Sequence, residues 1–418
     1  MLRFMISFML ILILTGLAYG AEYDELVEFV GNVSVMDLVG LKAVETARDL
    51  LEFKELLVIT NAGYCKIGEY TTEKALNGLM IGAKVSRGKG TLVNVFSHYN
   101  APLWFAFFDK KSKDCVYLEV NSTTLKKYLE MEKENRTKAL QEFMNLDPTD
   151  LFVRIAKENI DAEKLLTDPE SWQKKMVEKV FGGNEFRIVT IANVWAKGVP
   201  NDFMRIVEVH DHVCPGLISG YMIAKYLADV FPSQNPRKEY VIIAVPPWCK
   251  DDAFIVLFGT TPGHKNMFVK WLTPEQKAML PDKAKNVANI VIKRDMKTGE
   301  LKGIVVGFNW SKAMKMGGVK REDFKSFDTY KWLWARLKLN LLLIDYLDKY
   351  EMFVYTIKTF SLKPEELEKF KSAGVNPLVE LGIMKEQSDV EKEETPGFTA
   401  ILALIAVIIV IARVKRNK

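Results

Sequence analysis

Two stretches of the chain follow one pattern: ELLVITNAGYCK at residues 55–66 and YVIIAVPPWCK at residues 240–250. Each contains a short apolar run and continues into a turn that ends in the pair Cys-Lys. A short apolar run bounded by turn residues is typical of a buried β-strand. The two stretches therefore predict an internal repeat, in which each copy has a buried strand followed by a cysteine-bearing turn.

The segments around both stretches extend the repeat. A helix-like segment precedes each strand, at 38–51 in the first copy and at 217–230 in the second. A helical stretch, a glycine-containing turn and further strands follow each cysteine, ending at 116–120 and 304–308. Helices that alternate with strands indicate a layered fold. We expect an α+β fold with two α/β repeats, of which the first is degenerate, with helical insertions and a C-terminal transmembrane anchor.

The regions outside the repeats are predicted to be helical. The first is rich in Lys and Glu at helical spacing, and the second has an apolar stripe through Leu333, Leu337 and Leu341 that is typical of a core-facing helix. The expected domains are a signal peptide (1–20), a degenerate repeat (22–122), a helical linker (123–185), a second repeat with the His/Cys motif (186–312), a C-terminal helical region (313–385), a stalk (386–396) and a transmembrane or sorting segment (397–414).

The N-terminus has the pattern of a secretory signal peptide. Arg3 supplies a positive charge, and residues 4–17 form a short apolar run. Ala18 and Gly20 place small residues before a cleavage point at Ala21. An uncleaved N-terminal anchor is the alternative. Both interpretations predict that the rest of the chain is exported.

The C-terminus has the pattern of a membrane anchor. A charged stretch at 386–394 is followed by Pro396-Gly397-Phe398, an apolar run at 400–412 and a basic tail. By the positive-inside rule, the tail is cytoplasmic and the body lies on the extracytoplasmic face of the cell membrane, with membrane lipid as a partner. Pro396-Gly397-Phe398 also resembles the archaeal C-terminal sorting signal of surface proteins. That resemblance implies exchange of the segment for a lipid, so its retention stays open.

The composition argues against several classes of protein. A net charge of +5 over 418 residues, without a basic stripe interleaved with aromatic residues, gives no support to nucleic-acid binding. Four cysteines, Cys65, Cys115, Cys214 and Cys249, are too few for a disulfide scaffold. We therefore look for function in a local cluster of residues.

The stretch with the clearest chemical character is His210-Asp211-His212-Val213-Cys214. It follows an apolar run at 204–209, which we interpret as a strand. In an extended chain the side chains of 210, 212 and 214 leave on the same face, because side chains alternate along a strand. Two imidazoles and a thiol on one face suit a transition metal, zinc first, with nickel or iron as alternatives.

Two cysteines complete the predicted metal site. Cys214 precedes Pro215-Gly216, which we expect to begin a helix, and a helix N-terminus favours the thiolate form. The repeat places Cys249 on a strand-to-helix turn, so we expect Cys249 to approach the cluster. The predicted metal ligands are therefore His210, His212, Cys214 and Cys249.

Asp252 and His264 are predicted to handle protons if the site is catalytic. Asp252 lies on the same turn as Cys249, and His264 lies in the glycine turn of the second copy. Residues 209–216 correspond to residues 30–37 of the first copy, where neither the imidazoles nor the thiol occur. We interpret the first copy as a degenerate partner that serves packing or shapes the site.

Two structural interpretations compete with a metal site. The histidines can cap the following helix or bond a neighbouring carbonyl, and Cys214 and Cys249 can form a structural disulfide. The His-x-His-x-Cys spacing is only moderately specific, because no paired Cys-x₂-Cys motif accompanies it. His98 stands alone and is interpreted as a structural histidine.

The motif at 210–216 resembles the His-x-His-x-Cys-Pro-Gly signature of the FmdE-like family, named for a formylmethanofuran dehydrogenase component that is encoded beside the molybdenum enzyme of methane-producing archaea. Cys249 with Asp252-Ala253, and Gly-Thr-Thr-Pro-Gly at 259–263, extend the resemblance. It covers residues 190–310 well and 30–120 in degraded form. It implies an α+β fold and a metal at the His/Cys cluster. The cysteine-rich ribbon of many members is absent, and the family's Gly-Lys-Gly is replaced by Gly263-His264-Lys265.

We therefore expect an exported, membrane-anchored protein that binds a transition metal and, if it is an enzyme, acts on a small molecule. The alternative is a non-catalytic module that captures a cofactor or small ligand in a cleft formed with the first copy. A structural surface protein is the third hypothesis. Whether the chain is an enzyme and whether it forms a homodimer stay open.

Overall fold

The computed structural model describes residues 20–327 and 329–385, which fall into two compact units. The larger unit consists of the described residues up to Trp271 together with Asn286–Pro364. The smaller unit consists of Leu272–Lys285 and the described residues from Glu365 onward. Every residue of the predicted metal site belongs to the larger unit.

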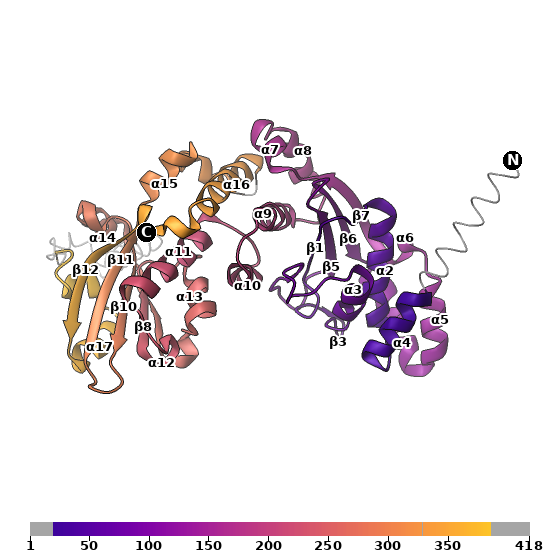
Figure 1. The fold of residues 1–418 in the computed structure, drawn as a ribbon, viewed down its shortest axis with the longest axis horizontal. Helices are drawn as coiled ribbons and strands as arrows, with labels where there is room; N and C mark the ends of the chain where they lie inside the picture. The colour runs from indigo at the N-terminus through magenta and orange to yellow at the C-terminus, as the bar shows by residue number, and fades with distance from the viewer. Residues whose placement is uncertain (1–19, 328, 386–418) are drawn as a thin grey trace, which may run out of the picture. The chain divides into compact units, whose positions relative to one another are not determined.

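The larger unit contains two five-stranded sheets that repeat one topology (Figure 1). The first sheet has the order β4-β1-β5-β6-β7, and the second has the order β9-β8-β10-β11-β12. In each sheet only the first pair, β1 with β4 or β8 with β9, is parallel. The strands are β1 Leu56–Thr60, β4 Leu92–Asn94, β5 Trp104–Asp109, β6 Asp114–Val120, β7 Phe152–Asn159, β8 Tyr240–Ala244, β9 Met267–Val269, β10 Val287–Arg294, β11 Leu301–Phe308 and β12 Val354–Leu362.

A long helix begins at the same point of each copy. α2 (Val35–Leu50) is capped by the hydroxyl of Ser34, and α11 (Pro215–Val230) begins with a proline after Cys214. Shorter helices, α3 (Ala75–Ala83) and α13 (Asp251–Phe258), pack against them. The helix α10 (Asn201–His210) leads into α11.

Glycines allow each long helix to touch a neighbouring backbone. A Cβ on Gly40 would lie 2.0 Å from the carbonyl oxygen of Ala75, and a Cβ on Gly220 would lie 2.2 Å from that of Lys250. One turn earlier in α11, a Cβ on Gly216 would lie 2.9 Å from the Cβ of Cys249. Only residues without a side chain permit these distances. α11 thereby holds the turn that carries Cys249 close to its own first turn.

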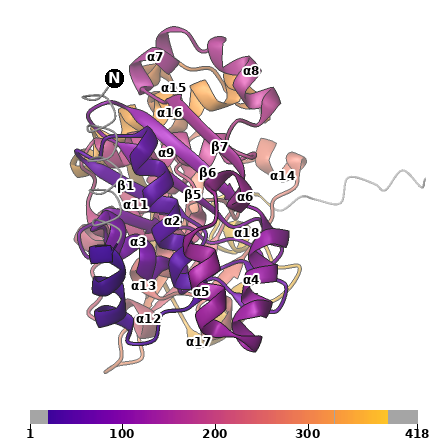
Figure 2. The same ribbon diagram turned by 90° about the vertical axis from the view of Figure 1, so that its right-hand side faces the viewer.

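The first sheet is covered on both faces. Phe105 and Phe107 pack in a core with α2, α4 (Ser122–Glu134) and α5 (Arg136–Met144), which lie together in Figure 2. The alternate residues Ala106 and Phe108 pack in a second core that also contains side chains of α9 (Glu185–Ala196) and α11. This second core includes residues of both copies, so it joins them within the larger unit.

Each unit contains further helices. In the larger unit they are α6 (Pro148–Leu151), α7 (Ala162–Thr167), α8 (Ser171–Glu178), α12 (Pro236–Glu239), α15 (Trp310–Gly317) and α16 (Tyr330–Ile344). The smaller unit holds α14 (Pro274–Ala278), all but the first residue of α17 (Pro364–Lys371), and α18 (Pro377–Glu380). An ion pair of 2.7 Å between Lys369 and Glu380 links α17 to α18.

Three local predictions differ from the structure. Residues 204–209 belong to the helix α10, so their interpretation as a strand was wrong. The buried side chains of Phe203, Met204, Ile206 and Val207 recur at helical spacing, a signal that the short apolar run concealed. The predicted helical segments 123–185 and 313–385 each contain the fifth strand of a sheet, β7 or β12.

The predicted fold class was wrong. The structure is a mixed α/β fold with two large sheets and many helices, rather than an α+β fold that ends in a transmembrane anchor. Across residues 20–327 and 329–385, no helix combines the length and apolar character needed to cross a membrane. The stalk at 386–396 and the segment at 397–414 lie outside the described residues, as does the signal peptide apart from Gly20.

The contact of α11 with Lys250 yields a stability prediction. We expect Gly220→Ala to lower the free energy of unfolding by about 1–3 kcal/mol, because the new methyl group must displace the Lys250 carbonyl. Gly263→Ala is the matched control, since its Cβ would meet nothing closer than 3.8 Å. Urea denaturation of both variants measures the difference. Equal stability of the two would contradict the close packing.

Candidate metal centre

A tight turn between α10 and α11 brings His210 and Cys214 together. His210 is the last residue of α10, and Cys214 caps the N-terminus of α11. Between them, Asp211 has a φ of 68°, a left-handed conformation that ends α10. Gly31 has the equivalent conformation in the first copy, with a φ of 71°. The turn is therefore common to both copies, but only the second places a β-carbon at its strained position.

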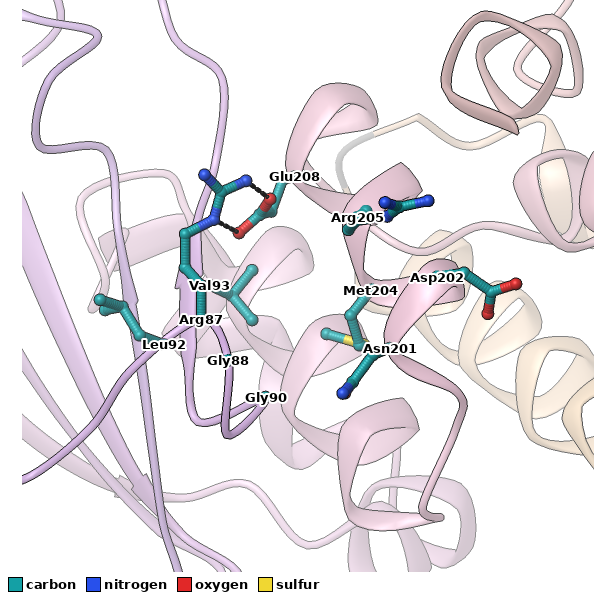
Figure 3. Close-up of a pocket in the computed structure, with 10 residues that line it drawn as sticks. All are labelled: Arg87, Gly88, Gly90, Leu92, Val93, Asn201, Asp202, Met204, Arg205 and Glu208. Atoms are coloured by element: carbon teal, nitrogen blue, oxygen red, sulfur yellow. Dashed lines mark hydrogen bonds and ion pairs between the residues drawn. The ribbon is translucent and has the colours of Figure 1, made fainter. Parts of the chain in front are cut away.

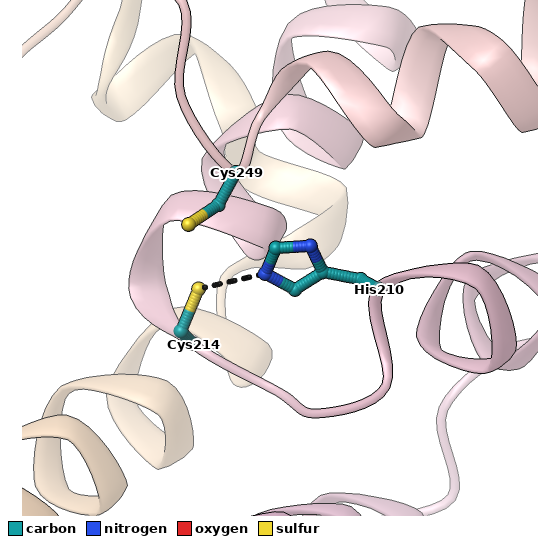
Figure 4. Close-up of side chains that lie close together, drawn as sticks. All are labelled: His210, Cys214 and Cys249. Atoms are coloured by element: carbon teal, nitrogen blue, oxygen red, sulfur yellow. Dashed lines mark hydrogen bonds between the residues drawn. The ribbon is translucent and has the colours of Figure 1, made fainter. Parts of the chain in front are cut away.

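Three ligand atoms converge at this turn. The side chains of His210, Cys214 and Cys249 each offer one, and these atoms all lie within 4.8 Å of one another. The Sγ of Cys214 is 3.5 Å from the Nε2 of His210. In Figure 4 the two sulfurs and the imidazole face the same small space, from α10, from the start of α11 and from the turn after β8.

The spacing of these atoms fits a tetrahedral metal ion. Zinc binds sulfur at about 2.3 Å and imidazole nitrogen at about 2.0–2.1 Å, which separates the two donors by about 3.5 Å in tetrahedral geometry. The distance from Cys214 to His210 has this value. Two thiols and one imidazole are soft and borderline ligands, which suit zinc and other transition metals better than calcium or magnesium.

The two thiols and the imidazole share charge. A hydrogen bond from Cys214, together with the imidazole of His210, lowers the pKa of Cys249 against the opposing effect of burial. The hydrogen bond to Cys249 and burial raise the pKa of Cys214. Burial disfavours the imidazolium of His210, but hydrogen bonds to Asp252 and Cys249 outweigh it and raise its pKa to about 9. The metal-free cluster therefore holds one thiolate beside one imidazolium.

Asp252 orients His210. Its Oδ2 lies 2.7 Å from the Nδ1 of His210, which directs the Nε2 towards the sulfurs. A carboxylate on the far nitrogen of a histidine ligand is the usual arrangement around zinc, because it fixes the ring and increases its basicity. Asp252, predicted to handle protons, is thus placed to position a ligand.

His212 lies beside the cluster but outside the group of three ligand atoms. Its Nδ1 is 2.7 Å from the Oδ1 of Asp211, and its ring centroid is 4.3 Å from that of His210. Arg187 holds the other side of Asp211 through an ion pair and donates to the Asp211 carbonyl over 3.1 Å. That His212 is a metal ligand stays a prediction.

His264 makes its hydrogen bonds with residues outside the cluster. It is exposed on a short 3₁₀ turn, where its Nε2 lies 2.7 Å from Arg237 and its Nδ1 lies 3.0 Å from the hydroxyl of Thr261. None of its hydrogen bonds within the described residues reaches the cluster. Its predicted role with protons gains no support from these contacts.

Residues distant in sequence fix the turn. The N–H of Val213 donates to the hydroxyl of Thr190 over 3.2 Å, and the amide of Asn340 donates to the Val213 carbonyl over 2.8 Å. Thr190 and Asn340 are both fully buried. Sequence reasoning missed these two residues and Arg187, because α9 and α16 carry no local motif.

The first copy lacks the cluster although it keeps the turn. Its helix α2 begins after Ser34, so the structure aligns Ser34 with Cys214, one residue away from the alignment of 30–37 with 209–216. Cys65, the equivalent of Cys249, is buried, and its Sγ lies 3.5 Å from the hydroxyl of Thr72. The first copy therefore has one thiol and a serine where the second has two thiols.

A cavity of about 640 Å³ lies between the copies, on the helix that carries His210 (Figure 3). The first copy contributes its glycine turn, and α10 contributes the opposite wall. Arg87 and Glu208 form a two-pronged ion pair at one end of it. The lining residues are Arg87, Gly88, Gly90, Leu92, Val93, Asn201, Asp202, Met204, Arg205 and Glu208.

Comparison with known proteins supports the resemblance of the second copy. Residues 209–326 match the family described as FmdE, Molybdenum formylmethanofuran dehydrogenase operon. The match includes His210, Cys214 and Cys249, and it ends before α16. A search of curated proteins found no match to the chain.

The charge distribution predicts a thiolate signal in the metal-free protein. We expect the ultraviolet absorbance of one thiolate to persist at about pH 6, where an ordinary cysteine is protonated. Cys249→Ser should abolish the signal, because Cys249 has the lowered pKa. Cys65→Ser should keep it, since burial raises the pKa of Cys65. Absence of thiolate below pH 7 in the wild type would refute the shared charge.

The left-handed conformation of Asp211 predicts which of two variants is more stable. At this position glycine should be more stable than alanine, whereas in a helix alanine should be the more stable of the two. Asp211→Gly should be about 1 kcal/mol more stable than Asp211→Ala, because both lose the carboxylate but only glycine avoids the left-handed strain. The order should invert at Asp252, inside α13, where glycine costs about 1 kcal/mol relative to alanine. Urea denaturation of the four variants provides the test. The same order at both positions would contradict the strained turn.

Proposed function

We propose that the chain binds one transition metal ion through His210, Cys214 and Cys249, with zinc as the first candidate and nickel or iron as alternatives. The observation that carries this proposal is the convergence of one imidazole and two thiols with the donor spacing of a tetrahedral site. The residue behind His210 is also of the expected kind, since the carboxylate of Asp252 bonds the far nitrogen of the imidazole.

Three protein ligands are typical of a reactive site rather than a structural one. Structural zinc sites use four protein ligands, whereas catalytic sites keep the fourth position for water or substrate. A metal in this position would polarise a substrate carbonyl or acidify bound water. Around it, Asp252 holds His210 in place, and the Asp211–His212 pair stands beside the ring of His210. We therefore extend the proposal to chemistry on a small molecule.

A second candidate function is capture of a small ligand without turnover. The cavity between the glycine turn of the first copy and α10 favours it, because both copies line this space. Its volume is within the range of sites for small molecules. Saturable ligand binding that survives loss of the metal would support this function over catalysis.

Export of the chain remains part of the proposal. The support for it is the charged start, apolar run and small residues at 1–20. An exported pair of adjacent thiols is exposed to oxidation, and a bound metal would keep Cys214 and Cys249 from forming a disulfide. The resemblance of Pro396-Gly397-Phe398 to an archaeal sorting signal is a separate proposal that rests on sequence alone.

Elemental analysis of the chain purified without oxygen tests metal binding. We expect about one metal ion per wild-type chain, and loss of that metal in His210→Ala, Cys214→Ser and Cys249→Ser, because each removes one of three ligands. Cys65→Ser is the matched control, since Cys65 is the equivalent of Cys249 in the copy without a cluster. His212→Ala decides whether this histidine is a further ligand. Wild-type protein without metal, with Cys214 and Cys249 disulfide-linked, would refute the proposal.

A further inference from the structure

The helix α16 lies against the metal centre although it is outside the family match at 209–326. Asn340 of this helix donates a hydrogen bond to the carbonyl of Val213, between His212 and Cys214. One turn earlier, α16 carries Arg336 on the same face, because residues four apart lie above one another on a helix. The centre thus has a wall that the family match does not include.

Aromatic rings connect this wall to the histidines. The ring of Trp332, on α16, is 4.1 Å from that of Phe186, and Phe186 is 5.1 Å from His212. The guanidinium of Arg336 lies 4.0 Å from the centroid of Trp332. A continuous series of contacts therefore leads from Arg336 to the ring of His212, which itself contacts His210.

Arg336 is a partly buried cation on the face of α16 that carries Asn340. Burial lowers its pKa to about 10, while the negative charge of Cys214 and Cys249 acts in the opposite direction. Arg336 therefore keeps its positive charge at neutral pH, one helical turn from Asn340, which contacts the turn of the cluster.

The other charges at the centre have carboxylate or arginine partners in ion pairs, whereas Arg336 forms no ion pair with a carboxylate in the part of the chain that the structure describes. Arg187 pairs with Asp211, and His210 pairs with Asp252. No carboxylate in residues 20–327 or 329–385 forms an ion pair with Arg336, whose guanidinium donates to the Trp332 carbonyl over a long 3.5 Å. A bound metal would neutralise the thiolates, and partial burial of a cation without a carboxylate partner is costly, so the vicinity of Arg336 favours an anion.

We propose that Arg336 binds the carboxylate of a small-molecule substrate or ligand whose other end reaches the open position beside His210, Cys214 and Cys249. This inference rests on the proposed function, since it names the ligand class of the same site. One cation between the rings of Trp332 and Phe324 matches a singly charged, planar carboxylate better than a phosphate dianion. Trp332 and Phe186 supply an apolar wall for the rest of the molecule.

Selective alkylation of the metal-free full-length chain tests this proposal. Iodoacetate and iodoacetamide attach the same carbon to a cysteine sulfur and release iodide, but only iodoacetate carries a carboxylate. The ratio of their rates at Cys249, measured by mass spectrometry, is independent of thiolate content because both attack one sulfur. We expect Arg336→Gln to lower the iodoacetate-to-iodoacetamide ratio about tenfold, and Arg336→Lys to lower it less.

The control is Lys338→Gln, which removes a positive charge from α16 two residues away, on a different face, beside Trp334. It should leave the ratio unchanged. An equal ratio in the wild type and Arg336→Gln would overturn the proposal. Metal content of the same variant, measured before metal removal, reports separately on the proposed function, because Arg336 supplies no metal ligand.

A wild-type measurement covers the case in which Arg336→Gln does not fold. Acetate should slow the reaction of Cys249 with iodoacetamide in a saturable manner, relative to chloride at equal ionic strength. Absence of protection by acetate would overturn the proposal. Stronger protection by inorganic phosphate would overturn the assignment to carboxylates.

Discussion

The contact between the first turns of α11 and the backbone at Cys249 and Lys250 is the constraint on which the His/Cys cluster depends. Gly216 and Gly220, one helical turn apart, leave no side chain between the helix and this turn. The distance between the helix and this turn is too short for a methyl group. The sulfur of Cys249 therefore lies close to that of Cys214 at the start of the helix. Because the two thiols are so close, ionisation of one opposes ionisation of the other: two thiols in a desolvated site cannot both ionise without a cation. His210 and a bound metal are alternative sources of that positive charge.

Comparison of the two copies shows which features belong to the shared fold and which belong to the His/Cys cluster alone. Both have the same strand order, a left-handed turn before the long helix, and a glycine contact that packs this helix against its neighbour. Ser34 caps α2 through its hydroxyl, and Cys214 caps α11 by accepting a hydrogen bond of 3.4 Å from the N–H of Leu217. A thiol therefore replaces a hydroxyl at one cap without loss of the helix. The copies therefore differ in the residues of this turn, while the strand order and the long helix are alike.

Sequence reasoning located β1, β8 and the three residues that converge at the cluster, but it failed where contacts are distant. The apolar runs at β1 and β8 were sufficient to predict these two strands. The repeat correctly suggested that Cys249 lies near Cys214. The argument from an extended chain at 210–214 found His210 and Cys214 for a wrong reason, because a helix end and a turn bring them together. The β-branched and aromatic residues of β12 were a usable signal that the helical interpretation overrode. Nothing local could reveal Arg187, Arg336 or Asn340, since they act through tertiary packing.

The helix α10 is shared by the cavity and the metal centre, and this gives the two spaces a mechanical link. Glu208, which is tied to Arg87 at the cavity, is only two residues from His210 at the end of the helix. A ligand that competes for Arg87 would remove one of the contacts that hold Glu208, which also accepts hydrogen bonds from Asn94 and Phe96. Any shift of α10 that followed would move the imidazole relative to the sulfurs. Thermodynamic reciprocity then requires that occupancy of the centre alter affinity in the cavity by the same factor. The first copy would in this way be coupled to the cluster in the second copy.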